Sequence, residues 1–144
     1  MTPHRLVTRL DTSEAAYIAG LIDGEGTVTL TRAHRNENRR LVVSISNNEI
    51  AILRFVKSVT GAGKITSKRK YKEHHGASFT YQLSSRQALD LLRQIVGYMN
   101  SYKAIRARLA LDKYLPLTPR NGRYTVAQLA ARDAFEAEFL AIRP

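Results

Sequence analysis

The sequence predicts an α+β domain in which two antiparallel hairpins are separated and followed by helices. Four segments place apolar residues at every second position, which is the period of a half-buried strand. The segments around them repeat apolar residues every third or fourth position, as in a helix packed on one side. The predicted order is α-ββ-α-ββ-α, with extra helices at the C-terminal end. Because the chain has 144 residues, 44% of them apolar, we expect one compact domain over residues 1–144.

The first predicted helix begins after Asp11. Glu14 follows three residues later, so the two side chains have the spacing of a capping box. The glycines after Asp23 end this helix. Two alternating segments come next, TVTLTRAHR and RRLVVSISN, and the polar RNEN between them suits a hairpin loop.

The second predicted helix runs from Asn48 to Thr60, with Gly61 as its C-terminal stop. The residues expected on its buried face are Ile52, Phe55, Val56 and Val59.

A second pair of alternating segments, GKITSKRKY and ASFTYQLS, predicts another hairpin. Phe79, Tyr81 and Leu83 are expected to face the core. The remaining chain is predicted to form three helices, from Ser84 or Ser85 to about Val96, from near Asn100 to Leu115, and from Thr125 to the C-terminus.

Composition restricts the class of partner. Lys and Arg total 23 against 12 Asp and Glu, a formal net charge of +11 that favours nucleic acid before a membrane surface. No apolar run approaches the roughly 20 residues of a membrane span, and the first ten residues lack the apolar core of a secretory signal. The absence of cysteine excludes a disulfide framework and a thiolate metal site. We therefore expect an intracellular protein without a membrane segment, in a compartment that the sequence does not specify.

The outward faces of the four predicted strands are polar or cationic. They present Thr, Ser, Arg, Lys and Gln with almost no acidic residue, whereas an ordinary solvent-facing sheet usually includes Asp and Glu. A twisted sheet of this kind can lie along a groove of duplex DNA, and we favour that interpretation over a simple solvated face.

The stretch YIAGLIDGEG, from Tyr17 to Gly26, contains glycines inside a predicted helix. Each such Gly costs about 1 kcal/mol relative to Ala, yet Ala16, Gly20 and Gly24 recur at every fourth position. Small residues in a stripe allow another helix to approach closely. Because the chain has no second copy of this stretch, the expected partner is the same helix of a second subunit.

The same stretch ends on two carboxylates, Asp23 and Glu25, where a helix carries partial negative charge. A two-fold dimer would bring both copies of Glu25 together and increase the repulsion. Hard divalent cations with oxygen ligands, Mg²⁺ above all, would offset it. In a basic protein shaped for DNA, paired divalent cations suggest phosphodiester hydrolysis.

YIAGLIDGEG resembles the signature of the LAGLIDADG homing endonucleases, with Ile18 to Gly26 aligned on its nine letters. Leu21 and Ile22 are unchanged, and Glu25 stands at the metal-binding acidic position. The resemblance extends through the element order and covers roughly residues 12–115. The single motif resembles the homodimeric branch of the family.

The resemblance implies roles for five residues. Glu25 would bind Mg²⁺, or another divalent cation such as Mn²⁺, through its carboxylate, and Gly24 through its carbonyl. Asp23 would support the helix end, and Asn47 stands nearest to a Gln that holds water in the family's active site. Lys103 matches a family Lys beside the scissile phosphate, although an exposed lysine at a helix start is an equally good interpretation. Glu in place of the motif's second Asp lengthens the reach of the ligand, and the resemblance places no catalytic Arg.

The implied function is that of a site-specific, divalent-metal-dependent endonuclease that cuts both strands of a long, roughly palindromic DNA duplex as a homodimer. In the family this activity drives the mobility of introns or inteins. The alternative is a protein of the same fold that does not cut, either a DNA-binding regulator or an RNA-splicing maturase. The expected sequence-reading residues are Thr29, Thr31, Arg35, Arg40, Ser44, Thr66, Lys68, Lys70, Thr80 and Gln82. The expected dimer contacts are Ala16, Gly20 and Gly24.

Overall fold

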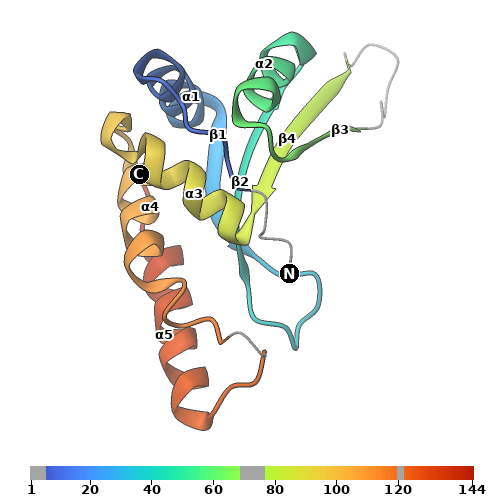
Figure 1. Ribbon diagram of the computed structural model, residues 1–144. Helices are drawn as coiled ribbons and strands as arrows, with labels where there is room; N and C mark the ends of the chain where they lie inside the picture. Colours follow the sequence, from blue (N-terminus) through green and yellow to red (C-terminus); the bar gives the residue numbers. More distant parts are fainter. Residues whose placement is uncertain (1–5, 69–76, 120–121) are drawn as a thin grey trace.

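The computed structural model describes residues 6–68, 77–119 and 122–144. In this part of the chain, helices and strands follow the predicted order (Figure 1). The first half contains α1 (Thr12–Glu25), β1 (Gly26–Thr31), β2 (Arg40–Asn47) and α2 (Ile50–Thr60). The second half contains β3 (Lys64–Lys68), β4 (Ser78–Ser84), α3 (Ser85–Ile95), the 3₁₀ turn η1 (Val96–Tyr98), α4 (Tyr102–Lys113) and α5 (Val126–Ala141). The predicted α+β class is therefore confirmed.

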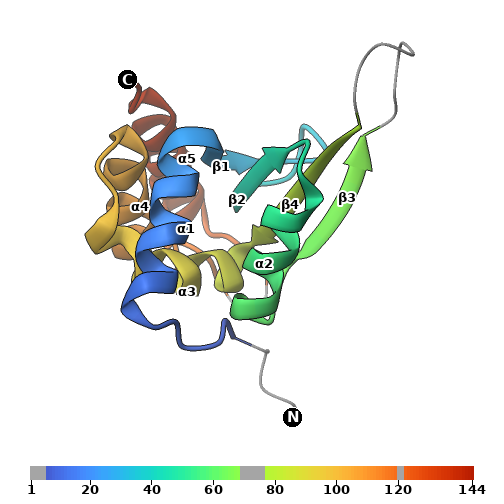
Figure 2. The same cartoon turned by 90° about the horizontal axis from the view of Figure 1, so that it is seen from above.

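The four strands form one antiparallel sheet in the order β1-β2-β4-β3. α1, α2 and α3 lie on one side of the sheet, while α4 and α5 contact β1 at its edge (Figures 1 and 2). The opposite face leaves Thr27, Thr31, Ser46 and Thr66 exposed. The sheet therefore has one packed face and one outer face, as the alternating sequence pattern predicts.

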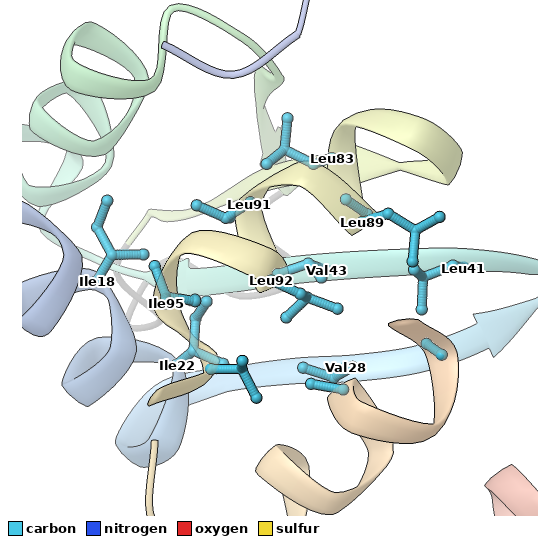
Figure 3. Close-up of a cluster of buried hydrophobic side chains, with 14 of the residues drawn as sticks. Ile18, Ile22, Val28, Leu41, Val43, Leu83, Leu89, Leu91, Leu92 and Ile95 are labelled. Carbon is cyan, nitrogen blue, oxygen red and sulfur yellow. The ribbon is translucent and has the colours of Figure 1, made fainter. Parts of the chain in front are cut away.

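The core lies between the packed face of the sheet and the helices that cover it. Figure 3 shows Ile18 and Ile22 of α1 turned toward the side chains of α3 and of the strands. The strand residues in this core occupy alternate positions, as expected for a half-buried strand: Val28, Leu30, Leu41, Val43, Ile45, Tyr81 and Leu83. The core fixes the end of α1 against the first two strands, which determines where the carboxylates of α1 emerge.

The predicted buried face of α2 is partly wrong. The structure buries Leu53, Val56 and Thr60, whereas Phe55 remains 42% exposed. Thr60 is accepted in the core because its hydroxyl lies 2.9 Å from the carbonyl of Val56 and 2.8 Å from the Tyr81 hydroxyl. Because these hydrogen bonds satisfy its hydroxyl, Thr60 is buried on a helix face for which the sequence pattern predicted only apolar residues.

Local capping sets several helix ends. The predicted capping box is present, because Glu14 N donates to Asp11 Oδ1 at 2.8 Å and Asp11 N donates to Glu14 Oε1 at 2.9 Å. Thr125 and Gln128 form a second box at the start of α5. Gly61 ends α2 with a φ of 66°, a left-handed conformation that favours glycine. None of the helices in the described ranges is long and apolar enough to cross a membrane.

Candidate functional site

The carboxylate of Asp23 lies at the end of α1 and accepts hydrogen bonds from the turn that begins α4. Its donors are the backbone N–H of Asn100 at 2.8 Å, the backbone N–H of Ser101 at 3.1 Å and the Ser101 hydroxyl at 2.5 Å. Burial acts to raise the pKa of Asp23, but these hydrogen bonds and the charge of Lys103 outweigh it and lower the pKa. Asp23 is therefore an anion at the N-terminal end of α4, where helix polarity favours it.

Lys103 of α4 contacts the end of α1, just as Asp23 of α1 contacts the start of α4. Its Nζ donates to the carbonyl of Ile22 at 2.9 Å and to that of Asp23 at 3.0 Å. These carbonyls belong to the last turn of α1, so the ammonium group satisfies the partial negative charge there. Burial lowers the pKa of Lys103, and the nearby charge of Asp23 opposes this effect. The C-terminus of α1 and the N-terminus of α4 thus cap each other through Asp23 and Lys103.

Glu25 is the exposed carboxylate of the pair. Asn47, at the end of β2, donates from Nδ2 to Glu25 Oε2 at 2.5 Å. The amide of Asn47 is oriented by its other side, where Oδ1 accepts from the backbone N–H of Glu49 at 2.8 Å. The structure therefore brings Glu25 and Asn47 together, and the reciprocal caps hold Lys103 beside the same helix end.

The residues at the end of α1 fit a hard divalent cation only in part. Glu25 offers a carboxylate, and Gly24 is exposed with its carbonyl in the same turn. In the ranges that the structure describes, no group of three His, Cys, Asp or Glu side chains is close enough to hold a metal ion. Because Mg²⁺ requires about six oxygen ligands, one copy of this chain supplies too few of them. A cation bound here would need water, a phosphate group or a second subunit to supply the rest.

The stripe of small residues on α1 faces outward. Ala16, Gly20 and Gly24 are exposed, and a Cβ added at either glycine would meet no atom within 4 Å. Beside the stripe, Tyr17 and Phe55 are 46% and 42% exposed and pack edge to face with ring centroids 5.3 Å apart. Nothing in the described part of a single chain explains why α1 contains these glycines. Their role as dimer contacts stays a prediction.

The outer face of the sheet contains most of the residues expected to read DNA. Thr31, Arg40 and Thr66 are exposed, as is Arg35 in the β1–β2 loop. Four others on this face are half-buried: Thr29, Ser44, Thr80 and Gln82. Lys68 ends β3, and Lys70 lies outside the described residues. No Asp or Glu occurs in β1, β2, β3 or β4.

Two residues around the site were not anticipated from the sequence. Ser101 connects Asp23 to Lys103, because its hydroxyl donates to Asp23 and accepts from the backbone N–H of Lys103 at 3.2 Å. Its place before an amphipathic segment is the usual signal of an N-cap. Arg106, one turn after Lys103, donates to the carbonyls of Val28 and Ile142, each at 2.9 Å. Arg106 therefore connects β1 to the C-terminal segment.

This fold is that of the homing endonucleases. The homing endonuclease I-CvuI, solved with its target DNA in the presence of Ca²⁺, superposes with a TM-score of 0.71 at 16% identity over 91% of this chain and 82% of that one. The archaeal intron-encoded homing endonuclease I-Vdi141I, solved with DNA, gives 0.67 at 17% identity over 92% and 85%. The meganuclease I-SmaMI, also bound to DNA, gives 0.67 at 15% identity, and the match covers 90% of this chain but only 45% of that one.

The chain belongs to the LAGLIDADG-like domain family, whose model matches residues 12–108. This range includes α1 with its two carboxylates and the whole sheet, and it ends within α4. A comparison with curated proteins found no match. The membership predicted from YIAGLIDGEG is therefore confirmed, and α5 lies beyond the matched range.

Proposed function

We propose that this protein is a site-specific DNA endonuclease that depends on Mg²⁺ or a similar divalent cation and acts as a homodimer. The observation that carries the proposal is the position of Glu25. Its exposed carboxylate lies where α1 meets β1, between the outward stripe of α1 and the outer face of the sheet, whose strands contain no Asp or Glu. A metal-binding carboxylate at this junction would lie beside both the DNA on the sheet and the second subunit on α1.

The stripe and the incomplete ligand set both support the proposed homodimer. Glycines cost helix stability, and within the described part of one chain nothing packs against Gly20 or Gly24, so added methyl groups would be accommodated. Two copies packed along the stripe would bring both Glu25 carboxylates to one axis. The match to about half of the I-SmaMI chain is consistent with two copies of this chain forming one nuclease.

Four residues of the chain would have separate roles in cleavage. Glu25 and the Gly24 carbonyl would hold the cation, which when bound would polarise a water molecule and stabilise charge on the phosphate. Asn47 would orient the Glu25 carboxylate through the hydrogen bond already present. Lys103, held at the C-terminus of α1, would place positive charge near the phosphate backbone.

Affinity for DNA would come from the outer face and its cationic surroundings. With a net charge of +11 per chain, phosphate contacts should dominate binding. The side chains on the strands would then read base edges in the major groove.

The first prediction tests cleavage directly. A library of randomised duplexes is incubated with the protein in Mg²⁺, and cut ends are sequenced in parallel with bound but uncut duplexes. Wild type should yield cut ends from a narrow set of sequences. Glu25→Gln should bind the same set with similar affinity and lower the cleavage rate by at least about a hundredfold, because the amide is a poor ligand for a hard cation.

The matched control is Glu138→Gln, which changes the net charge equally at an exposed site on α5. Full cleavage by Glu25→Gln would contradict the metal role of Glu25. Selective binding by wild type without any cut ends would favour the alternative, a DNA-binding regulator or an RNA-splicing maturase of the same fold.

A further inference from the structure

A buried ionic network connects α5 to the residues that lead into β2. Arg132 and Glu136 of α5 are only 2% and 4% exposed. Arg132 Nε donates to Glu136 Oε2 at 3.2 Å, and Arg39 Nη1 donates to Glu136 Oε1 at 3.1 Å. One buried carboxylate is therefore shared by two guanidinium groups, one on its own helix and one at the end of the β1–β2 loop.

The guanidinium of Arg132 is held on every side. It donates to the Leu117 carbonyl at 3.2 Å, to the Thr118 hydroxyl at 2.6 Å and to the Arg39 carbonyl at 2.5 Å. Its carbon atom lies 4.8 Å from the centre of the Tyr114 ring. Since each polar edge and one flat face of the group have a partner, Arg132 has little freedom to move.

Stability alone is a poor explanation for such a network. Removing charges from water is expensive, and well-packed apolar residues often replace a buried ion pair at no loss of stability. Charged and hydrogen-bonded groups are directional, however, so they fix geometry more sharply than apolar contacts do. The network is therefore better explained by a neighbouring residue whose position it fixes.

That residue is Arg40, the first residue of β2. The carbonyl of Arg39, immediately before it, accepts from Arg132, and the N–H of Leu41, immediately after it, donates to the Tyr114 hydroxyl in a long bond of 3.4 Å. The backbone is thus held on both sides of Arg40 by the C-terminal helices. Figure 1 shows α5 and the β1–β2 loop at the same end of the molecule.

The side chain of Arg40 is exposed on the outer face of the sheet, between two hollows. One hollow, of about 400 Å³, is also lined by Lys64, Gln82 and Ser84. The other, of about 280 Å³, is formed with Thr31 and the β1–β2 loop, which contributes both Arg32 and the carboxylate of Glu37. An arginine so placed is suited to bidentate recognition of guanine, which requires the backbone that presents it to be rigid.

We propose that Arg39, Arg132 and Glu136 form a positioning network for sequence recognition, which fixes the backbone around Arg40 and so determines the base that Arg40 reads. The inference rests on the proposed function, because it requires that the outer face bind duplex DNA. It assigns α5, which lies beyond the family match, a role in specificity although none of its residues need touch DNA.

The test compares base preference, position by position, for duplexes selected from a randomised library by wild type and by variants. Arg40→Ala identifies the base pairs that Arg40 reads, where discrimination should fall by about 5- to 100-fold. Glu136→Gln should reduce preference at the same base pairs by at least about fivefold, because its amide NH₂ must face one of the two arginines. Preference elsewhere in the site should be unchanged.

Three further variants keep the test decisive. Glu138→Gln adds the same charge to α5 through an exposed partner of Lys113, so it controls for a general gain of DNA affinity. Arg39→Gln breaks the network at its half-exposed end and decides the matter if Glu136→Gln does not fold. Arg143→Gln, at an exposed site near the C-terminus, is its control for lost charge.

Loss of preference confined to the Arg40 base pairs supports the proposal. An unchanged preference in both network variants would overturn it, and so would a uniform loss of affinity with preference intact at every position. If wild type selects no duplex at all, the proposed function fails, and this outcome is distinguishable because it appears before any variant is compared.

Discussion

Asp23 and Glu25 are separated by one residue and have different surroundings. Asp23 accepts three hydrogen bonds from the start of α4, whereas Glu25 is exposed and has the Asn47 amide as a partner. The Asp23 carboxylate is unfavourable for the C-terminus of α1 but well placed for α4, because helix polarity is reversed there. The motif thus supplies one acidic residue that holds helices together and one that is available to a ligand.

The structural role of Asp23 predicts its effect on stability. Asp23→Ala removes three hydrogen bonds and should lower the free energy of unfolding by about 1–2 kcal/mol at pH 7, in the range of a lost helix cap. Denaturant unfolding of the metal-free protein measures this. Asp112→Ala, at an exposed site in α4, is the control and should change the free energy by less than about 0.5 kcal/mol.

The stability lost in Asp23→Ala depends on pH in a direction that the pKa of Asp23 determines. Because the folded protein holds the pKa of Asp23 below its ordinary value of 3.8, the charged form stabilises the fold above that pH. The contribution is lost as the pH falls through the depressed pKa. The difference in unfolding free energy between wild type and Asp23→Ala should therefore shrink on acidification below about pH 4. A constant difference down to pH 2 would mean that the carboxylate's charge is not the stabilising feature.

α1 combines a buried face with an outward stripe that no described segment of its own chain covers. Ile18 and Ile22 anchor the buried face in the core, while Gly20 on the opposite side has open space around it. A larger residue at Gly20 should be tolerated by a single chain and should even favour the helix by up to about 1 kcal/mol. The same residue would prevent two α1 helices from approaching closely.

Gly20→Leu should therefore give a folded monomer. Wild type is expected to sediment as a dimer at micromolar concentration and the variant as a monomer with unchanged helix content. Ala130→Leu puts the same leucine side chain on the exposed side of α5 and should leave the dimer intact. A dimeric Gly20→Leu variant would show that the subunits associate elsewhere.

How far the sequence could predict the contacts of each helix depended on how far apart the partners lie along the chain. The capping box of Asp11 and Glu14 and the stop at Gly61 were foreseen because their partners are at most four residues away. The contact between Asp23 and Ser101 joins residues 78 positions apart, and that between Arg132 and Arg39 joins residues 93 apart. No local pattern encodes either. The buried face of α2 was misjudged for the same reason, because Thr60 depends on Tyr81 for its burial.

The molecule as a whole presents an outer face whose strands contain no Asp or Glu, next to the stripe that we assign to dimerisation. In a two-fold dimer, the two sheets would form one continuous surface, and their charges would add to a formal +22, twice the +11 of one chain. Binding should accordingly weaken steeply with salt, as counterion release requires. Salt dependence does not distinguish a dimer from a monomer, but the symmetry of the target does.

A two-fold dimer should select two-fold targets. Sequences recovered by wild type from a randomised duplex library are expected to be inverted repeats, because each subunit reads one half with the same side chains. Replacing one half-site should weaken binding by at least about tenfold, since half of the base contacts are lost while the phosphate contacts remain. Gly20→Leu should recover single half-sites with the same preferred bases. Asymmetric targets for wild type, equal in length to those of the variant, would mean that one chain reads the whole site and that the stripe on α1 has another use.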